Sequence, residues 1–228
     1  MRYRVLIALL LTAAMSGAQE RPPLSKTEVQ ELLAGGVSSA RAAKLVEQYG
    51  IDFAPTEIYL DTLRSQGATE VLLKALPAAA VKGHLARGAA FLEKDANPQA
   101  EQEYRAALQA DASSVAAHCG LGEALYEQEK LDPALAEYRE ALRLQPDSAA
   151  AHRGVGRALF KKKDTKGALA EIRESLRLKP DYAEAHGSLG AFLMSKGDVD
   201  AGIVESPRSA ALEARLRPGP QQLGHRSA

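Results

Sequence analysis

The 228-residue sequence contains no tryptophan and a single cysteine, Cys119. One thiol can form neither an intrachain disulfide nor a cysteine-based zinc site, which excludes both as sources of stability. Lysine plus arginine equals aspartate plus glutamate, at 29 each, so the formal net charge is zero. Without a basic excess, the composition gives no support for binding to nucleic acid or to a membrane surface.

Motifs for common catalytic chemistry are also missing. The sequence has no glycine-rich phosphate loop, no serine-nucleophile motif and no carboxylates at metal-ligand spacing. Cys119 follows His118, but adjacent residues on a helix point in different directions, so the two are not expected to act as nucleophile and base. We therefore predict no catalytic residues, no enzyme activity and no cofactor, with Cys119 a small groove or core residue.

One apolar run, from Val5 to Met15, lies near the N-terminus and is too short to span a bilayer. Arg2 and Arg4 precede it, and three small residues follow it. This pattern predicts a signal peptide over residues 1–18, with cleavage before Gln19 and an exported protein, periplasmic or secreted. An uncleaved N-terminal anchor is the alternative. No later stretch is long and apolar enough to be a membrane span.

A compact helical segment follows a short flexible lead that is predicted for residues 19–24. Four helices are expected between residues 25 and 79, the first opened by a capping box in which Ser25 and Glu28 pair. Thr56 is expected to cap the third helix and Phe53 to fill the core. The predicted stops are Gly35-Gly36, Gly50, Gly67 and Pro77.

This segment resembles a short helical module that precedes repeats or other domains in exported proteins of soil bacteria. The resemblance rests on the string L-S-K-T-E-V, followed by G-G-V-S-S-A-R and G-I-D-F-A-P-T. It implies no activity. We interpret the segment as a cap that packs on the first repeat, with a separate recognition module as the alternative.

The rest of the chain copies itself with a period of 34 residues, in units that begin at Val81, Val115, Ala149 and Ala183. The fourth residue of every unit is histidine. The eighth is glycine, the twentieth is alanine in three units, and proline closes two of them: Gly88, Gly122, Gly156, Gly190, Ala100, Ala134, Ala168, Pro146 and Pro180.

These landmarks resemble the tetratricopeptide repeat, whose 34-residue unit is a helix-turn-helix. The resemblance implies an all-α fold, a right-handed superhelix of such repeats preceded by the small helical cap. The expected repeats are 81–114, 115–148, 149–182 and a partial 183–205. Histidine replaces the family's first large aromatic residue. The chaperone-tail clamp of some relatives is not expected, because Leu85 and Ala89 stand where that clamp needs lysine and asparagine.

The resemblance also implies that the first helix of each unit lines a concave face. In the third unit, three cations recur at four-residue steps and form one basic stripe, suited to carboxylates. The second unit brings acidic residues to the same face. The predicted partner-binding groove therefore comprises Glu123, Tyr126, Glu127, Arg153, Arg157, Phe160 and Lys161. The alternative is a solvated face on which Arg157 pairs with Glu123.

The four equally spaced histidines, His84, His118, His152 and His186, do not predict a metal site. Equivalent residues of stacked helices lie roughly 10 Å apart, whereas metal ligands lie about 2 Å from the ion. Two such histidines cannot share one ion. We predict that they are helix-packing residues and that no metal is bound.

The repeat pattern fails in the second half of the fourth unit, where Gly202 replaces alanine and Pro207 interrupts the expected helix. Residues 206–228 are interpreted as a disordered or frame-shifted tail. Ser206 to Gly224 can be encoded by bases that, when read one nucleotide later, give the string R-A-A-L-R-L-K-P-D-Y-A-Q-A-H-N-N-L-G. This string would complete the fourth unit and open a fifth. An atypical terminal cap is the other interpretation.

The sequence therefore predicts a non-catalytic scaffold that binds a peptide or protein segment in the concave groove. The alternative is a structural assembly factor of an envelope complex that acts through its N-terminal helical module. Partners are expected to be proteins and not nucleic acid, and the oligomeric state stays open.

Overall fold

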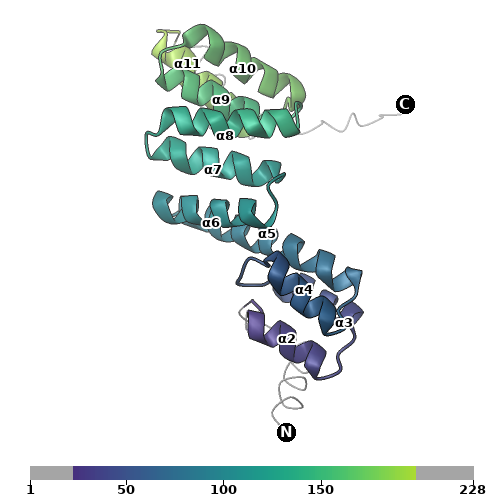
Figure 1. The fold of residues 1–228 in the computed structure, drawn as a ribbon. Helices are drawn as coiled ribbons and strands as arrows, with labels where there is room; N and C mark the ends of the chain where they lie inside the picture. The colour runs from purple at the N-terminus through teal and green to yellow at the C-terminus, as the bar shows by residue number, and fades with distance from the viewer. Residues whose placement is uncertain (1–22, 199–228) are drawn as a thin grey trace, which may run out of the picture. The chain divides into compact units, whose positions relative to one another are not determined.

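The computed structural model describes residues 23–198 and is drawn in Figure 1. Within this stretch the regular structure is α-helix, apart from one isolated parallel bridge between Leu24 and Ile51. This confirms the predicted all-α repeat fold. The expectations for the signal peptide, for residues 199–205 and for the tail lie outside the described residues.

The chain divides into two compact units, residues 1–130 and 131–228, which are described separately. The helices of the first unit are α2 (Lys26–Ala34), α3 (Ser39–Tyr49), α4 (Glu57–Ser65), α5 (Glu70–Leu92), α6 (Asn97–Ala110) and α7 (Val115–Glu127). Those of the second are α8 (Leu131–Leu144), α9 (Ala149–Lys161), α10 (Thr165–Leu178) and α11 (Ala183–Ser195).

The local signals at the N-terminal helices act as predicted. At the start of α2, the Glu28 N–H donates to Ser25 Oγ over 3.3 Å, and the Ser25 N–H donates to Glu28 Oε2 over 2.8 Å, which forms the capping box. Thr56 Oγ1 accepts from the Tyr59 N–H at the start of α4. Gly50 and Gly67 end α3 and α4 with φ angles of 73° and 89°, a region that favours glycine.

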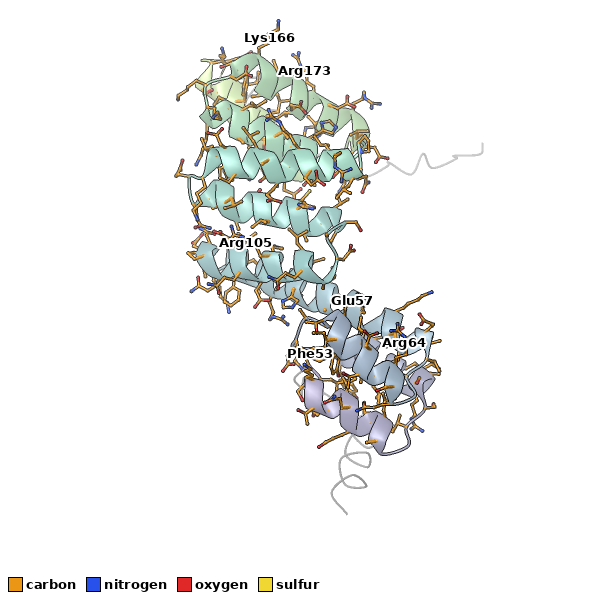
Figure 2. The ribbon with its side chains drawn as sticks, viewed as in Figure 1. Phe53, Glu57, Arg64, Arg105, Lys166 and Arg173 are labelled. Carbon is orange, nitrogen blue, oxygen red and sulfur yellow. The ribbon has the colours of Figure 1, made fainter. Side chains whose placement is uncertain are left out.

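Large aliphatic side chains from α2 to α5 form a closed hydrophobic core. Phe53, labelled in Figure 2, packs against this core. Its ring lies edge-on to that of Tyr59, with the ring centroids 5.2 Å apart. Burying each such side chain contributes about 1.5–3 kcal/mol. The largest fully buried members are Leu24, Val29, Leu32, Val46, Ile51, Leu63, Leu72 and Leu76.

Two predictions at the edges of this segment are wrong. The fourth helix does not stop near Pro77, because α5 continues through it to Leu92. Proline inside a helix costs about 3 kcal/mol, but Leu72, Leu76 and Ala80 are fully buried on this helix and offset that cost. The flexible lead also ends earlier, since the Leu24 N–H donates to the Gly50 carbonyl over 3.0 Å.

In the first unit, the Tyr104 ring of α6 lies between glycines of two other helices. A Cβ at Gly88 of α5 would stand 2.7 Å from Tyr104 Cζ, and a Cβ at Gly120 of α7 would overlap the ring. The two glycines therefore let α5 and α7 approach the tyrosine from both sides. Gly88 is one of the recurring repeat positions in the sequence, whereas Gly120 was not singled out there.

The second unit repeats this arrangement with one change. A Cβ at Gly154 of α9 would overlap the Tyr138 ring of α8, and a Cβ at Gly156 would lie 2.7 Å from Ile172 of α10. Ser175 Oγ of α10 donates to the Ala149 carbonyl over 2.7 Å, which ties the two helices together. Small residues at these contacts thus allow close helix packing against a larger side chain, Tyr138 or Ile172.

Candidate protein-interaction surface

Helix α9 in the second unit carries the predicted basic stripe. Arg153, Arg157 and Lys161 follow one another at four-residue steps on this helix, and all three are half-buried. A rise of 1.5 Å per residue spreads them over about 12 Å of the helix. Each makes contacts within the protein. The stripe is therefore a real feature of one helix face and is partly accessible.

Aromatic rings accompany the stripe in the same unit. The Phe160 ring of α9 contacts the Phe192 ring of α11, with centroids 4.9 Å apart. Arg153 Cζ lies 5.8 Å from the centroid of the Tyr182 ring, which directly precedes α11, and Lys179 Nζ lies 4.7 Å from it. These contacts connect α9 with α11 through charged and aromatic groups.

The acidic residues predicted to face this stripe lie on α7, in the first unit. Glu123 is half-buried, and Glu127 is exposed. Burial and the negative charge of Glu123 raise the pKa of the Tyr104 phenol, so Glu123 lies near that ring. Because the two units are described separately, a groove that combines α7 with α9 stays a prediction.

Tyr126 is the weakest member of the predicted groove. Only 7% of the residue is exposed to solvent, so its ring is largely removed from any approaching partner. The expectation that this ring lines an exposed surface does not fit its burial. Phe160 and Lys161 remain half-buried and offer more surface.

The recurring histidines connect helices instead of facing a shared centre. His152 Nδ1 lies 2.7 Å from Glu171 Oε2, and its Nε2 lies 3.0 Å from the Pro146 carbonyl oxygen. His84 Nδ1 lies 2.7 Å from Glu103 Oε2, and His186 Nε2 lies 2.8 Å from the Pro180 oxygen. The histidines thus bind the preceding turn, the second helix of their own unit, or both.

A glutamate stands 19 residues after the histidine in every unit. This spacing could have predicted the histidine–glutamate contacts, but the family pattern drew attention to the missing aromatic residue instead. Besides Glu103 and Glu171, the spacing places Glu137 after His118 and Glu205 after His186. Within residues 23–198, no three histidine, cysteine, aspartate or glutamate side chains are grouped so that they could hold a metal ion.

The first unit holds a buried carboxylate that the sequence analysis did not single out. Glu101 of α6 accepts from Gln128 Nε2 over 2.7 Å and from Lys130 Nζ over 3.0 Å, and it pairs with Arg105. Burial favours the neutral carboxyl. Hydrogen bonds from Gln128 and Lys130, with the charges of Arg105 and Lys130, outweigh burial and hold the pKa below its usual value.

A small hollow lies between α3 and α5 in the first unit. It measures about 160 Å³ and is lined by Glu47, Ala75, Ala78, Ala79 and Lys82. Pockets for small molecules usually enclose about 300–1,000 Å³, so this hollow offers little to a cofactor. In the stretch from Pro23 to Asp198, no helix is both long and apolar enough to cross a membrane.

Comparison with protein families gives one assignment. The family model described as tetratricopeptide repeat matches residues 85–149 and, overlapping them, residues 119–183. No curated protein sequence matches the chain. The matched residues run from the C-terminal part of α5 through α10 and lie within the stretch that carries the 34-residue period.

Solved structures with the same fold include pilF of Pseudomonas aeruginosa. It is 23% identical, with a TM-score of 0.51, and the match covers 60% of this chain and 63% of pilF. An O-GlcNAc transferase mutant of Thermobaculum terrenum is 25% identical, with a TM-score of 0.49, over 51% of this chain. The chain spans only 22% of the length of that transferase.

A third similar structure is the first repeat domain of Spaghetti (RPAP3), solved with an HSP90 peptide. It is 18% identical, with a TM-score of 0.46, and the match covers 51% of this chain and 93% of that domain.

Proposed function

The chain is a tetratricopeptide repeat protein, and on this premise we propose that it is a scaffold that binds a protein or peptide segment in its concave groove. The observation that carries the proposal is the face of α9, where Arg153, Arg157 and Lys161 lie in register beside Phe160. Such a preformed surface binds through shape and a few charged and aromatic contacts, with little ordering cost on the protein side.

Charge reversal on this face tests the proposal. The full chain would carry a photo-reactive phenylalanine analogue at Phe160, and cross-linked partners would be identified by mass spectrometry. The double variant R153E/R157E should lose most of the cross-linked partner, because the stripe then repels what it attracted. The matched control R139E/R173E changes the charge equally at two exposed arginines and should keep the cross-linked partner; Arg139 lies on α8, and Arg173 of α10 is labelled in Figure 2. Equal yields from both variants would contradict the proposal.

A second candidate is the assembly factor that acts through the N-terminal module. Its support is a pair of exposed apolar side chains, Ile58 on α4 at 81% exposure and Val71 on α5 at 57%. In a pull-down with the full chain, the variant I58E/V71E would abolish partner capture if the module is the contact. It would leave capture intact if the groove is.

We also propose that the protein is exported and that its partners are therefore outside the cytoplasm. The support is the sequence of residues 1–18, in which two arginines precede an 11-residue apolar run. N-terminal sequencing of the protein purified from its native host should start at Gln19. A mature chain that begins at Met1 and is found in the cytoplasm would contradict this. No turnover is expected in a broad hydrolase screen.

A further inference from the structure

The histidines at the fourth position of the repeats do not all have the same partners. In three units the ring Nε2 lies beside the carbonyl oxygen six residues earlier, in the turn before the helix, at 3.2 Å for His118, 3.0 Å for His152 and 2.8 Å for His186. The equivalent carbonyl of the first unit belongs to Ala78, which lies inside α5. Because α5 runs on from the N-terminal module without a turn, that carbonyl belongs to the helix ladder. Among the described residues, the buried Nε2 of His84 has no hydrogen-bond partner.

His152 stands between two groups that can only accept hydrogen bonds. Its Nδ1 lies 2.7 Å from Glu171 Oε2 of α10, and its Nε2 lies 3.0 Å from the Pro146 carbonyl oxygen. A neutral imidazole carries one N–H and one bare nitrogen, whereas the imidazolium carries two N–H groups. Only the charged ring can donate to both partners. A neutral ring would turn a lone pair toward one of the two oxygens.

The charged groups of α10 also favour a protonated His152. Glu171 is in direct contact with the ring, and Glu174 is close enough to be affected by its charge. Hydrogen bonds from Arg177, together with the charges of Arg177 and His152, outweigh desolvation and hold the pKa of Glu174 below its usual value. Arg177 is the cation on this side, and it is bound to Glu174 over 2.8 and 2.7 Å.

The other elements around His152 contribute one polar contact and one further cation. From the side of α8 the facing group is the Pro146 carbonyl, which the exposed Asp147 follows in the chain. On α9 itself Arg153 is the next residue, and its guanidinium lies 5.8 Å from the Tyr182 ring. The groups in contact with the imidazole are therefore an anion and a carbonyl, while the neighbouring arginines contact other groups.

His84 occupies the same repeat position but lies beside a cation. Its Nδ1 is 2.7 Å from Glu103 Oε2 and 2.8 Å from Arg87 Nη2, and Arg87 Nε donates to the same Glu103 oxygen over 2.9 Å. Arg87 thus already balances the carboxylate. A charged His84 would place a second cation beside that guanidinium and an unsatisfied N–H at the buried Nε2, both of which cost free energy. The neutral ring fits His84, whereas the charged ring fits His152.

We propose that His152 is a proton-sensitive link between α9 and α10, which holds the two helices together when the ring is charged and loosens when it loses a proton. Stability that depends on a protonated histidine is present in acid and is lost as the pH rises. Histidine changes charge between about pH 5 and 8, a range in which glutamate stays ionised. Because α9 carries Arg157 and Phe160 of the candidate surface, the same proton sets how firmly that surface is held. The inference does not depend on which partner the surface binds.

The ring protons can be observed directly. The full chain would be labelled with nitrogen-15 in its histidines, and long-range proton–nitrogen NMR spectra would be recorded at about pH 7. His152→Gln and His84→Gln identify the two signals. His152 should show two protonated ring nitrogens, and His84 should show one protonated and one bare nitrogen. The inference is overturned if the two rings give the same pattern, or if His152 has a bare nitrogen.

Amide hydrogen exchange tests the link itself, because it reports on single helices and so separates His152 from the other histidines. Protection factors correct for the intrinsic effect of pH on exchange. For amides of α9 that face α10, they should fall by about fivefold from about pH 6 to about pH 8, the factor for losing one hydrogen bond. In Glu171→Gln the fall should be less than about twofold, because an amide can both donate and accept and suits the ring with or without its second proton.

Glu103→Gln is the matched control. It makes the same change beside His84 in the first unit, and it should leave the pH dependence of α9 as in the wild type. Protection of α5 and α6 in the wild-type chain should change by less than about twofold over the same range, because Arg87 stays charged throughout. The inference is overturned if α5 and α6 lose as much protection as α9. It is also overturned if Glu171→Gln keeps the full wild-type pH dependence.

Discussion

The N-terminal helices and the repeats bury their apolar residues in opposite ways. Helices α2 to α4 and the first half of α5 enclose long aliphatic side chains in one closed cluster. In the repeats, alanine and glycine occupy many of the buried positions, and a tyrosine or isoleucine fills the space beside the close helix contacts. Buried examples are Ala100, Ala107, Ala117, Ala134, Ala141, Ala151, Ala158 and Ala168.

This difference shows which kind of substitution each region tolerates. A core of long side chains is harmed most when one is shortened, because a cavity remains. A core of close helix contacts is harmed most when a small residue is enlarged, because the helices are forced apart. Helix α5 belongs to both regions: Leu72 and Leu76 lie in the aliphatic cluster, and Gly88 contacts Tyr104.

Shortening a side chain of the aliphatic cluster should have the largest effect. Leu63 of α4 is fully buried, so Leu63→Ala is expected to lower the free energy of unfolding by about 2–5 kcal/mol. The matched control is Ile58→Ala on the same helix, where 81% of the residue is already exposed and the loss should be below about 0.5 kcal/mol. Chemical denaturation followed by circular dichroism measures both. Similar losses for the two variants would contradict the assigned core.

Enlarging a small residue of the repeats should come next. A Cβ at Gly120 would overlap the Tyr104 ring, so Gly120→Ala is expected to destabilise by about 1–3 kcal/mol. This opposes the gain of about 1 kcal/mol that alanine normally brings to a helix.

Gly83→Ala on α5 provides the control for this prediction. Its Cβ would meet its nearest neighbours at 3.4 Å, an ordinary contact, so alanine there should be neutral or stabilising. If Gly120→Ala were as stable as Gly83→Ala, the close approach of α7 to Tyr104 would be wrong.

The sequence predicted the repeat contacts better than the ends of the N-terminal module. The 34-residue period shows which positions recur, and in the structure a Cβ at Gly88 or Gly156 would crowd Tyr104 or Ile172. Gly120 was missed because the residue that it approaches, Tyr104, belongs to the preceding repeat. Aligning the repeats with one another shows which positions recur, but not which residues of adjacent repeats lie close together. The continuation of α5 through Pro77 was missed because the burial that offsets the proline comes from α3 and other helices distant in sequence.

For the candidate surface, the spacing of Arg153, Arg157 and Lys161 along α9 was predictable from helical periodicity alone. The burial of Tyr126 and the contact of Tyr182 with Arg153 depend on helices that meet only in the folded chain. The histidine contacts were hidden by the family pattern, which suggested an aromatic packing residue where the structure has a hydrogen-bonding one.

A buried carboxylate makes the first repeat an exception to the apolar packing of the others, since Leu135 stands at the position equivalent to Glu101. The folded-state pKa of Glu101 is lowered, so its contribution to stability is present above the unfolded-state pKa and is lost as pH falls through the folded value. Glu101→Gln removes the charge that accepts from Lys130. It should cost about 1.5–3 kcal/mol at neutral pH, the scale of a hydrogen bond to a charged group.

Urea denaturation of both chains at pH 7 and near pH 3 tests this sign. The difference between wild type and Glu101→Gln should shrink as the pH drops below about 4.5, because protonation neutralises the wild-type carboxyl as well. A difference that is constant or grows toward low pH would contradict a charged Glu101 in the folded protein.

The smallest expected loss of stability comes from removing a serine at a helix start, and it should differ between the repeats and the N-terminal helices. Ser114 Oγ accepts from the Ala117 N–H at the start of α7, whereas Ser38 at the start of α3 makes no side-chain cap. Ser114→Ala should therefore lower the free energy of unfolding by about 0.5–1 kcal/mol. Ser38→Ala should lower it by less than about 0.5 kcal/mol. Amide hydrogen exchange of the first turns of α7 and α3 should show the same order. If exchange accelerates equally at both helices, the side-chain cap does not contribute and local fraying governs both starts.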